Sequence, residues 1–178
     1  MLDGEEHIII RAVQGDSSAF GALYDHYQPK IYRFVLIKVS HREEAEDITH
    51  QVFINAWASI ASYQNLGFPF SSWLYRIARN QVIDFYRTKK NDASLDEINP
   101  DTIPDIAEST GGAEMRFEMQ RVMGAIQKMK QEYQDVIMMR FVEELNVKET
   151  AHAIHKTEGA VKVLQHRALK QLKLLLQQ

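Results

Sequence analysis

Cysteine is absent from the 178-residue chain, which excludes disulfide bonds and thiolate metal sites. No apolar run approaches the roughly 20 residues that a membrane span needs. The start of the chain also lacks the basic segment and long apolar core of a secretory signal. Strand signals are nearly absent, because the apolar residues recur mostly at helical spacing. The sequence therefore predicts a cytoplasmic, all-α protein without membrane insertion.

Catalytic patterns are equally scarce. The seven histidines form no HExxH pair, and the chain has neither a phosphate-binding glycine loop nor a Ser-His-Asp arrangement. His152 and His155 lie three residues apart, a spacing that can place both on one helix face, but without companion ligands they are expected to be solvated. We predict that the protein is not an enzyme and holds no metal or cofactor.

Charge is unevenly distributed along a chain whose net charge is −3. Residues 1–69 carry nine anions and five cations, and residues 70–90 carry five cations against Asp84 alone. Residues 91–115 carry seven anions and no cation, whereas residues 145–178 carry six cations and two anions. Such alternating blocks indicate separate surfaces with separate partners.

Four helices are expected before residue 91, over about 5–14, 17–39, 40–60 and 70–90. Asp16 is the expected N-cap of the second helix, which Pro29 should kink or divide. Ser40 and Glu43 have the spacing of a capping box for the third helix. Ser71 or Ser72 is the expected cap of the fourth. The expected buried residues are Ala45, Ile48, Val52, Ala56 and Ile60 in the third helix and Phe70, Leu74, Ile77 and Ala78 in the fourth.

Residues 70–90 place aromatic rings among cations, a combination that suits single-stranded nucleic acid because rings stack on bases and cations bind phosphates. The alternative is that the rings are ordinary core and the cations a solvated face. The third helix presents a second polar face, which is either solvated or a docking face for a basic partner helix. Its members are Glu43, Glu46, Asp47, His50, Gln51 and Asn55.

Residues 91–115 lose helical periodicity and are predicted to form an acidic, flexible linker. Helices are expected beyond it over about 116–128, 131–141, 147–155 and 157–177. The last two have helix-turn-helix spacing, with Thr157 as an N-cap, and this motif places its second helix in a DNA major groove. A helical hairpin used only for protein contact is the alternative. The residues expected to face outward are Lys162, Val163, His166, Arg167 and Lys170.

Three segments in this order, AEDITHQVFINAW, FSSWLYRIARNQVIDFYR and EGAVKVLQHRALKQL, resemble the sigma-70 family of bacterial transcription initiation factors, of the extracytoplasmic-function type. The resemblance covers about residues 15–176. It implies two small helical domains: residues 1–90, which dock on core RNA polymerase and bind and melt the −10 promoter element, and residues 116–178, which bind the −35 element. Residues 91–115 would link them.

The resemblance also implies roles for individual residues. Asp47, His50, Gln51 and Asn55 would dock on the clamp helices of the largest polymerase subunit, although His50-Gln51 stands where the family usually has Gln-Glu. Tyr63 and Asn80 would form a pocket for an unstacked −10 base. The strand itself would be held by four cations, Arg76, Arg79, Arg87 and Lys89. The hydrophobic loop from Gln64 to Phe70 departs from the polar residues that the family often has there.

The second domain would read −35 duplex DNA through Lys162, Val163, His166, Arg167 and Lys170. Val163 and Leu164 stand where serine and arginine are common, and His155 where the turn often has glycine, so a strained φ or a different turn is expected there. The resemblance also implies two further partners, the polymerase flap and an anti-sigma protein. A helix-turn-helix regulator that never binds polymerase is the competing hypothesis, but it leaves residues 1–90 without a role.

Overall fold

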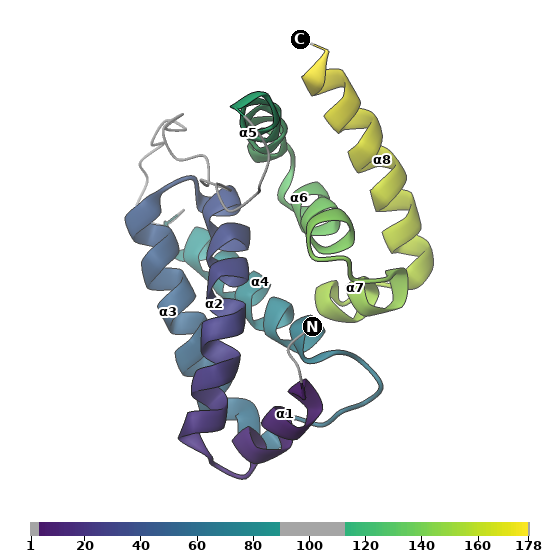
Figure 1. Cartoon of the computed structure of the whole chain (residues 1–178). Coiled ribbons are helices and arrows are strands. Elements are labelled where there is room, and N and C mark those ends of the chain that lie inside the picture. Colours follow the sequence, from purple (N-terminus) through teal and green to yellow (C-terminus); the bar gives the residue numbers. More distant parts are fainter. Residues whose placement is uncertain (1–3, 90–112, 178) are drawn as a thin grey trace.

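The computed structural model describes residues 4–89 and 113–177, and in those ranges its regular elements are all helices (Figure 1). The N-terminal domain consists of α1 (Glu5–Val13), α2 (Ser17–Val39), α3 (Arg42–Ser59), a 3₁₀ turn η1 (Ile60–Ser62) and α4 (Phe70–Lys89). The C-terminal domain consists of α5 (Ala113–Gln127), α6 (Gln131–Ile137), the π-helical turn η3 (Met138–Val142), α7 (Val147–Ile154) and α8 (Glu158–Leu176). The predicted all-α class is confirmed. Residues 91–112 of the predicted linker lie outside the described residues, and its last three residues, 113–115, belong to α5 instead.

The first two helices meet at the predicted cap. The Asp16 carboxylate accepts hydrogen bonds from the backbone N–H groups of Ser18 and Ala19, which satisfies two donors at the start of α2. α2 then continues through Pro29 and is not divided. Pro29 and Asp25 are both exposed, so water can bind the Asp25 carbonyl that the proline leaves without a donor.

Two of the predicted serine caps are wrong. Ser40 adopts a left-handed conformation with φ 57° and ends α2, and its N–H donates to the Leu36 carbonyl, so it forms no capping box with Glu43. Ser72 lies inside the first turn of α4 and is fully buried, and its Oγ donates to the Glu149 carbonyl on α7 at 2.9 Å. Ser40 therefore ends one helix instead of starting the next, whereas the role of Ser72 is decided by a contact with the other domain.

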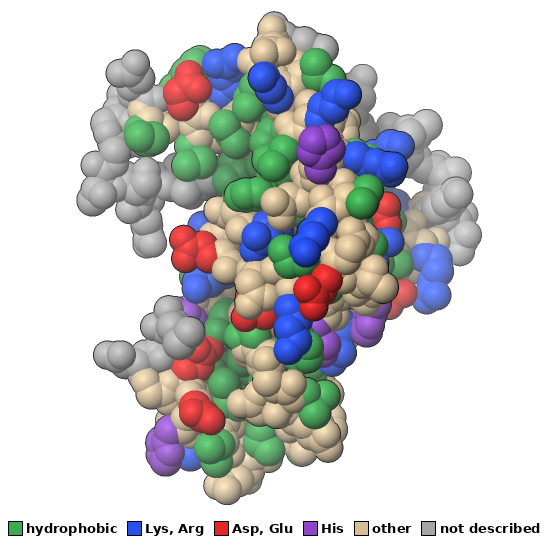
Figure 2. Space-filling model, turned by 90° about the vertical axis from the view of Figure 1, so that its right-hand side faces the viewer, with side chains coloured by type: hydrophobic (Ala, Val, Ile, Leu, Met, Phe, Trp, Pro, Cys, Tyr) green, Lys and Arg blue, Asp and Glu red, His purple; other side chains and the backbone are tan. Residues whose placement is uncertain are grey.

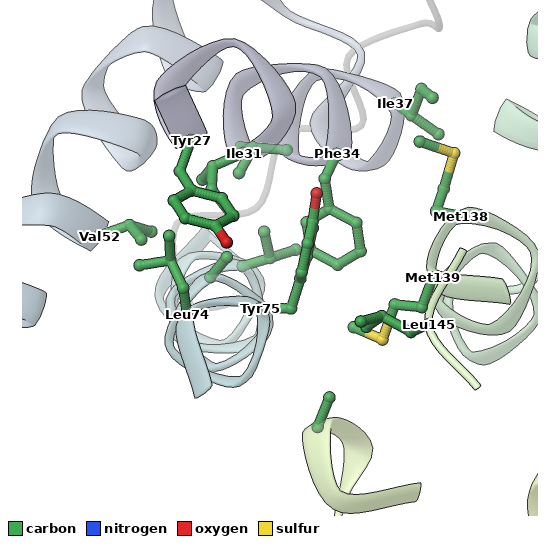
Figure 3. Close-up of a cluster of buried hydrophobic side chains, with 14 of the residues drawn as sticks. Tyr27, Ile31, Phe34, Ile37, Val52, Leu74, Tyr75, Met138, Met139 and Leu145 are labelled. Atoms are coloured by element: carbon green, nitrogen blue, oxygen red, sulfur yellow. The ribbon is translucent and has the colours of Figure 1, made fainter. Parts of the chain in front are cut away.

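The core of the N-terminal domain lies between α2, α3 and α4. Figure 3 shows Tyr27 and Phe34 of α2 pointing toward Leu74 and Tyr75 of α4. The predicted apolar stripe of α3 is confirmed, since all five of its residues are buried, and in α4 only Ile77 remains partly exposed. This burial fixes which sides of α3 and α4 face solvent.

The two domains pack against each other, with α4 against α7 and α2 against α5 and α6 (Figure 1). Met139 and Leu145 point from the C-terminal domain toward the α4 side of the core (Figure 3). A buried ionic cluster lies at the same seam: Asp135 of α6 forms ion pairs with Lys38 Nζ at 2.7 Å and with Arg79 Nε at 3.0 Å. The side chains of Lys38 and Asp135 are only 1% and 4% exposed. Because they belong to different domains, this contact exists only while the domains are together.

The helix-turn-helix forms as predicted. α7 ends at His155, which takes the strained left-handed conformation with φ 53°, and the Thr157 side chain accepts a hydrogen bond from Ala160 N–H at the start of α8. Ile154 and Val161 are buried between the two helices. The outer side of α8 is consequently free to meet a partner.

Candidate polymerase and nucleic-acid interfaces

The acidic face of α3 is open to solvent. Asp47, His50 and Gln51 are exposed, while Asn55 is half-buried and its Oδ1 accepts a hydrogen bond from Gln51 Nε2 at 2.9 Å. These positions recur at three- and four-residue steps, so they form one stripe on the helix. Ile54 lies on the same stripe with 53% of its surface exposed. It was not predicted from the sequence, because the face was identified from its charged and amide residues and Ile54 is apolar. The face is therefore an anionic and amide surface that includes one exposed apolar side chain.

A pocket of about 200 Å³ lies where the loop before α4 meets α4 and α7. Tyr63, Phe68 and Trp73 supply aromatic walls, Arg76 supplies a cation, and His152 of α7 completes the lining. The remaining lining residues belong to the loop: Ser62, Gln64, Leu66 and Pro69. Burial raises the pKa of Tyr63, so its hydroxyl stays protonated at neutral pH. The pocket offers flat apolar walls and one positive charge to a ligand.

Asn80, the predicted partner of Tyr63 in a base pocket, is not among the residues that line this cavity. It is exposed on α4, one turn beyond Arg76. The structure instead brings Tyr63 together with Arg76 and Phe68. The paired role of Tyr63 and Asn80 stays a prediction. Phe68, which belongs to the hydrophobic loop that departs from the family pattern, is an additional candidate for the pocket wall.

Most aromatic rings of α4 are core rather than a stacking platform. Phe70 and Tyr75 are 3% and 0% exposed, and Trp73 is 9% exposed and lines the pocket. The expectation that these rings lie ready to stack on bases is wrong for Phe70 and Tyr75, because helical periodicity turns them toward α2. Phe85 and Tyr86 remain partly exposed.

The predicted strand-holding cations differ in their surroundings. Arg76 is half-buried at the pocket, and Arg79 bonds the buried carboxylate of Asp135. Arg87 is 78% exposed and pairs with Asp84 at 3.2 Å, while Lys89 pairs with Glu44 at 3.0 Å. The exposed Arg87–Asp84 pair contributes little to stability, whereas the side chains of Lys89 and Glu44 are partly buried, at 31% and 26% exposure. Arg79 differs because its partner is buried and belongs to the other domain.

The recognition helix α8 presents its predicted residues to solvent. Val163 is 50% exposed, and the four polar members of the set, Lys162, His166, Arg167 and Lys170, are also exposed. Lys and Arg side chains are spread over the face of the molecule that includes α8 (Figure 2). Leu164, where the family commonly has arginine, is half-buried against the core. The arrangement suits contact with a polyanion along one side of α8.

No grouping of three or more metal-ligating side chains of the His, Cys, Asp or Glu type occurs within residues 4–89 and 113–177. Among the same residues, no helix has the length and apolar character needed to cross a bilayer.

Two segments of the chain match known protein families. Residues 23–91 match sigma-70 region 2, and residues 125–174 match sigma-70 region 4. The ECF RNA polymerase sigma factor BldN of Streptomyces coelicolor is 32% identical over 95% of this chain, which spans 64% of BldN. SigW of Bacillus subtilis, also an ECF RNA polymerase sigma factor, is 30% identical over 90% of both chains.

Two solved structures share the fold. CnrH in complex with the cytosolic domain of CnrY superimposes with a TM-score of 0.73 at 21% identity, covering 97% of each chain. The sigma factor RpoE of Bartonella quintana, solved with the anti-sigma factor NepR, also gives 0.73, at 18% identity over 89% of this chain and 96% of RpoE.

A helical region that matches sigma-70 region 2, followed by one that matches region 4, defines a DNA-binding transcription factor of sigma type. The chain belongs to the ECF group of the sigma-70 family, the promoter-specific sigma factors of transcription initiation.

Proposed function

We propose that this chain is a dissociable specificity subunit that docks on core RNA polymerase through α3, holds the separated −10 strand beside α4 and reads −35 duplex through α8. The observation that carries the proposal is the presence, on one chain, of an exposed acidic helix face and an exposed cationic recognition helix. A protein that only binds duplex DNA needs the second of these and not the first. The protein would act by binding, in the cytoplasm, and not by catalysis.

Docking on polymerase would use Asp47, His50, Gln51 and Asn55, together with the exposed Ile54. Charge complementarity between an anionic face and basic clamp helices speeds encounter and fixes orientation, while an apolar side chain supplies buried area. The C-terminal domain would contribute a second contact to the polymerase flap. An anti-sigma protein is a proposed further partner, since CnrH and the RpoE of Bartonella quintana were each solved with another protein, in the second case an anti-sigma factor.

At the −10 element, the pocket beside the loop would take one unstacked base, with Tyr63 and Phe68 as walls and Asn80 contacting the strand just outside. Arg76, Arg79, Arg87 and Lys89 would hold phosphates. Extruding a base costs a few kcal/mol, and stacking contributes about 1–3 kcal/mol per base, so capture can offset extrusion without nucleotide hydrolysis. The melted state is then trapped by binding.

At the −35 element, Lys162, His166, Arg167 and Lys170 would contact phosphates and base edges, and Val163 would meet a thymine methyl group. Phosphate contacts fix register and base contacts specify sequence, so the cations contribute mainly affinity.

Run-off transcription with core polymerase tests the proposal. Purified protein plus core polymerase should give transcripts from a cognate promoter selected from genomic DNA. Asn80→Ala should lower the yield of open complexes more than it lowers duplex binding. Gln28→Ala, a substitution on α2 away from these surfaces, serves as the control. If no genomic promoter is transcribed, the proposal is wrong.

Asp47→Arg separates the proposal from the competing view of a regulator that binds DNA alone. The side chain is exposed, so the substitution should leave folding intact while reversing one charge of the acidic face. Loss of co-purification with core polymerase, with duplex binding retained, is expected. A regulator that never binds polymerase would show no co-purification in either form.

A further inference from the structure

The side of α4 proposed for the separated strand is covered in this structure by the C-terminal domain. Ser72, Arg76 and Arg79 recur at four- and three-residue steps and so share one side of α4. On that side Ser72 is fully buried, and its Oγ lies 2.9 Å from the Glu149 carbonyl and 3.3 Å from His152 Nδ1. The covering elements are α6 and α7 of the same chain.

One contact has the geometry of a stacked base. The imidazole ring of His152 lies on the ring of Phe68 with centroids 4.0 Å apart and planes within 12° of parallel. Aromatic side chains stack on nucleobases face to face in single-strand sites. His152 also lines the pocket that contains Tyr63 and Arg76. A planar nitrogen heterocycle from the chain itself therefore lies at the wall where a base would stack.

A second contact has the chemistry of a bound phosphate. Arg79 Nε bonds Asp135 Oδ2 at 3.0 Å, and the Asp135 side chain is 4% exposed. Carboxylate and phosphate oxygens are alternative acceptors for the same guanidinium donors. While Asp135 Oδ2 accepts a hydrogen bond from Arg79 Nε, that donor is not available to a phosphate of a DNA strand.

We propose that α6 and α7 act as an internal stand-in for a nucleotide, with the His152 ring in place of a base on Phe68 and the Asp135 carboxylate in place of a phosphate on Arg79. This inference rests on the proposed function, because it assigns the same side of α4 to the −10 strand. The C-terminal domain and single-stranded DNA then exclude each other from α4. The free chain binds the strand weakly until the domains separate, whereas the outer side of α8 stays open throughout.

The polar character of the two contacts supports exchange with DNA. Each broken contact can be replaced by an equivalent one: a base for the imidazole on Phe68, and a phosphate for the carboxylate on Arg79. Lys38, the other partner of Asp135, becomes hydrated when the domains part. The competition therefore leaves no charged group of this cluster buried without a partner in the open state.

Fluorescence anisotropy with the full-length chain tests the competition. The probe is a labelled single-stranded DNA of mixed sequence and about 12 nucleotides, within the span that such sites cover. Combining His152→Ala with Asp135→Asn should tighten binding about tenfold over the unsubstituted chain. His155→Asn is the matched control, because this exposed neighbour lies outside the contact and asparagine accepts its φ of 53°. It should bind as the unsubstituted chain does.

His152→Gln, whose site is partly exposed, provides a second variant if the double substitution does not fold. It removes the ring and keeps a polar side chain, and it should also tighten binding.

Spin labels give an independent readout. The chain has no cysteine, so Asp25→Cys and Lys173→Cys, at exposed positions in the two domains, can be labelled cleanly. Adding the single-stranded probe should lengthen the distance between the labels. Equal affinity in all variants, together with an unchanged distance when DNA is bound, would overturn the inference.

Failure of the proposed function gives a different pattern. In that case neither the unsubstituted chain nor the His152 variants bind the probe, and Arg76→Ala leaves open-complex formation by the polymerase complex unchanged. Competition for α4 is then overturned as well, even if the labels report that the domains are closed.

Discussion

Replacing Asp135 with alanine should open the molecule. The substitution removes the partner of Lys38, whose side chain is 1% exposed and whose ammonium would keep only the Gln131 carbonyl at 3.4 Å and the Phe34 ring at 5.2 Å. Removing one partner of a buried ion pair costs about 3–5 kcal/mol, because the remaining charge stays desolvated. Arg79 adds less to this cost, since its side chain is 17% exposed and can reach water.

Separation of the domains limits that cost. Lys38 belongs to the N-terminal domain and Asp135 to the C-terminal domain, so parting them returns the ammonium to water. A penalty of 3–5 kcal/mol corresponds to a shift of the closed-to-open ratio by a factor on the order of 10² to 10³. The variant should therefore populate open molecules while each domain remains folded.

Small-angle X-ray scattering measures this opening directly. A compact chain of 178 residues has a radius of gyration of about 16 Å, and Asp135→Ala should raise the value with the helical circular dichroism retained. Lys38→Met combined with Asp135→Leu should restore the closed form, because apolar side chains of similar volume can replace a buried ion pair. Asp84→Ala, at an exposed ion pair, is the control. An unchanged radius and an unchanged unfolding midpoint for Asp135→Ala would refute the reasoning.

Three further predictions concern single positions. Lys162→Ala should weaken duplex binding for all sequences and reduce the salt slope of the binding constant by about 1, as measured by titration at several salt concentrations. His155→Gly should stabilise the protein by about 1 kcal/mol in thermal unfolding, since only the non-glycine residue is strained at φ 53°. The hydrogen bond from the Ala19 backbone N–H, followed by the one from the Arg11 side chain, lowers the pKa of Asp16, so the contribution of Asp16 to stability is complete above the unfolded pKa of about 3.9 and disappears as pH falls through the lower folded pKa. The stability difference between Asp16→Asn and the unsubstituted chain should accordingly shrink below about pH 4 in urea unfolding.

The helices could be predicted because each leaves a local signature. The Asp16 and Thr157 caps, the stripe from Ala45 to Ile60 and the strained turn at His155 all follow from residues within a few positions of one another. At Ser72, where the local signature failed, a distant contact had replaced the local one. Ser72 caps nothing because its hydroxyl bonds a carbonyl on α7, 77 residues further along the chain.

The candidate site was less predictable for the same reason. Exposure on α3 and α8 follows from helical periodicity, so those faces could be identified in advance. The pairing of Arg79 with Asp135 and the stacking of Phe68 on His152 join residues from different domains, and no sequence spacing encodes them. Nothing in the pattern of α4 distinguished Arg79 from Arg87, yet one lies at the domain seam and the other at the surface.

The buried amine of Lys38 makes this residue a natural reporter of the state of the molecule. Amine-reactive reagents modify lysines that water can reach, so Lys38 is shielded whenever α6 covers it and becomes reactive once α6 departs. Mass-spectrometric footprinting of this one side chain, in extracts or in whole cells, would measure the fraction of the protein in which the two domains are packed together and the fraction in which they are apart.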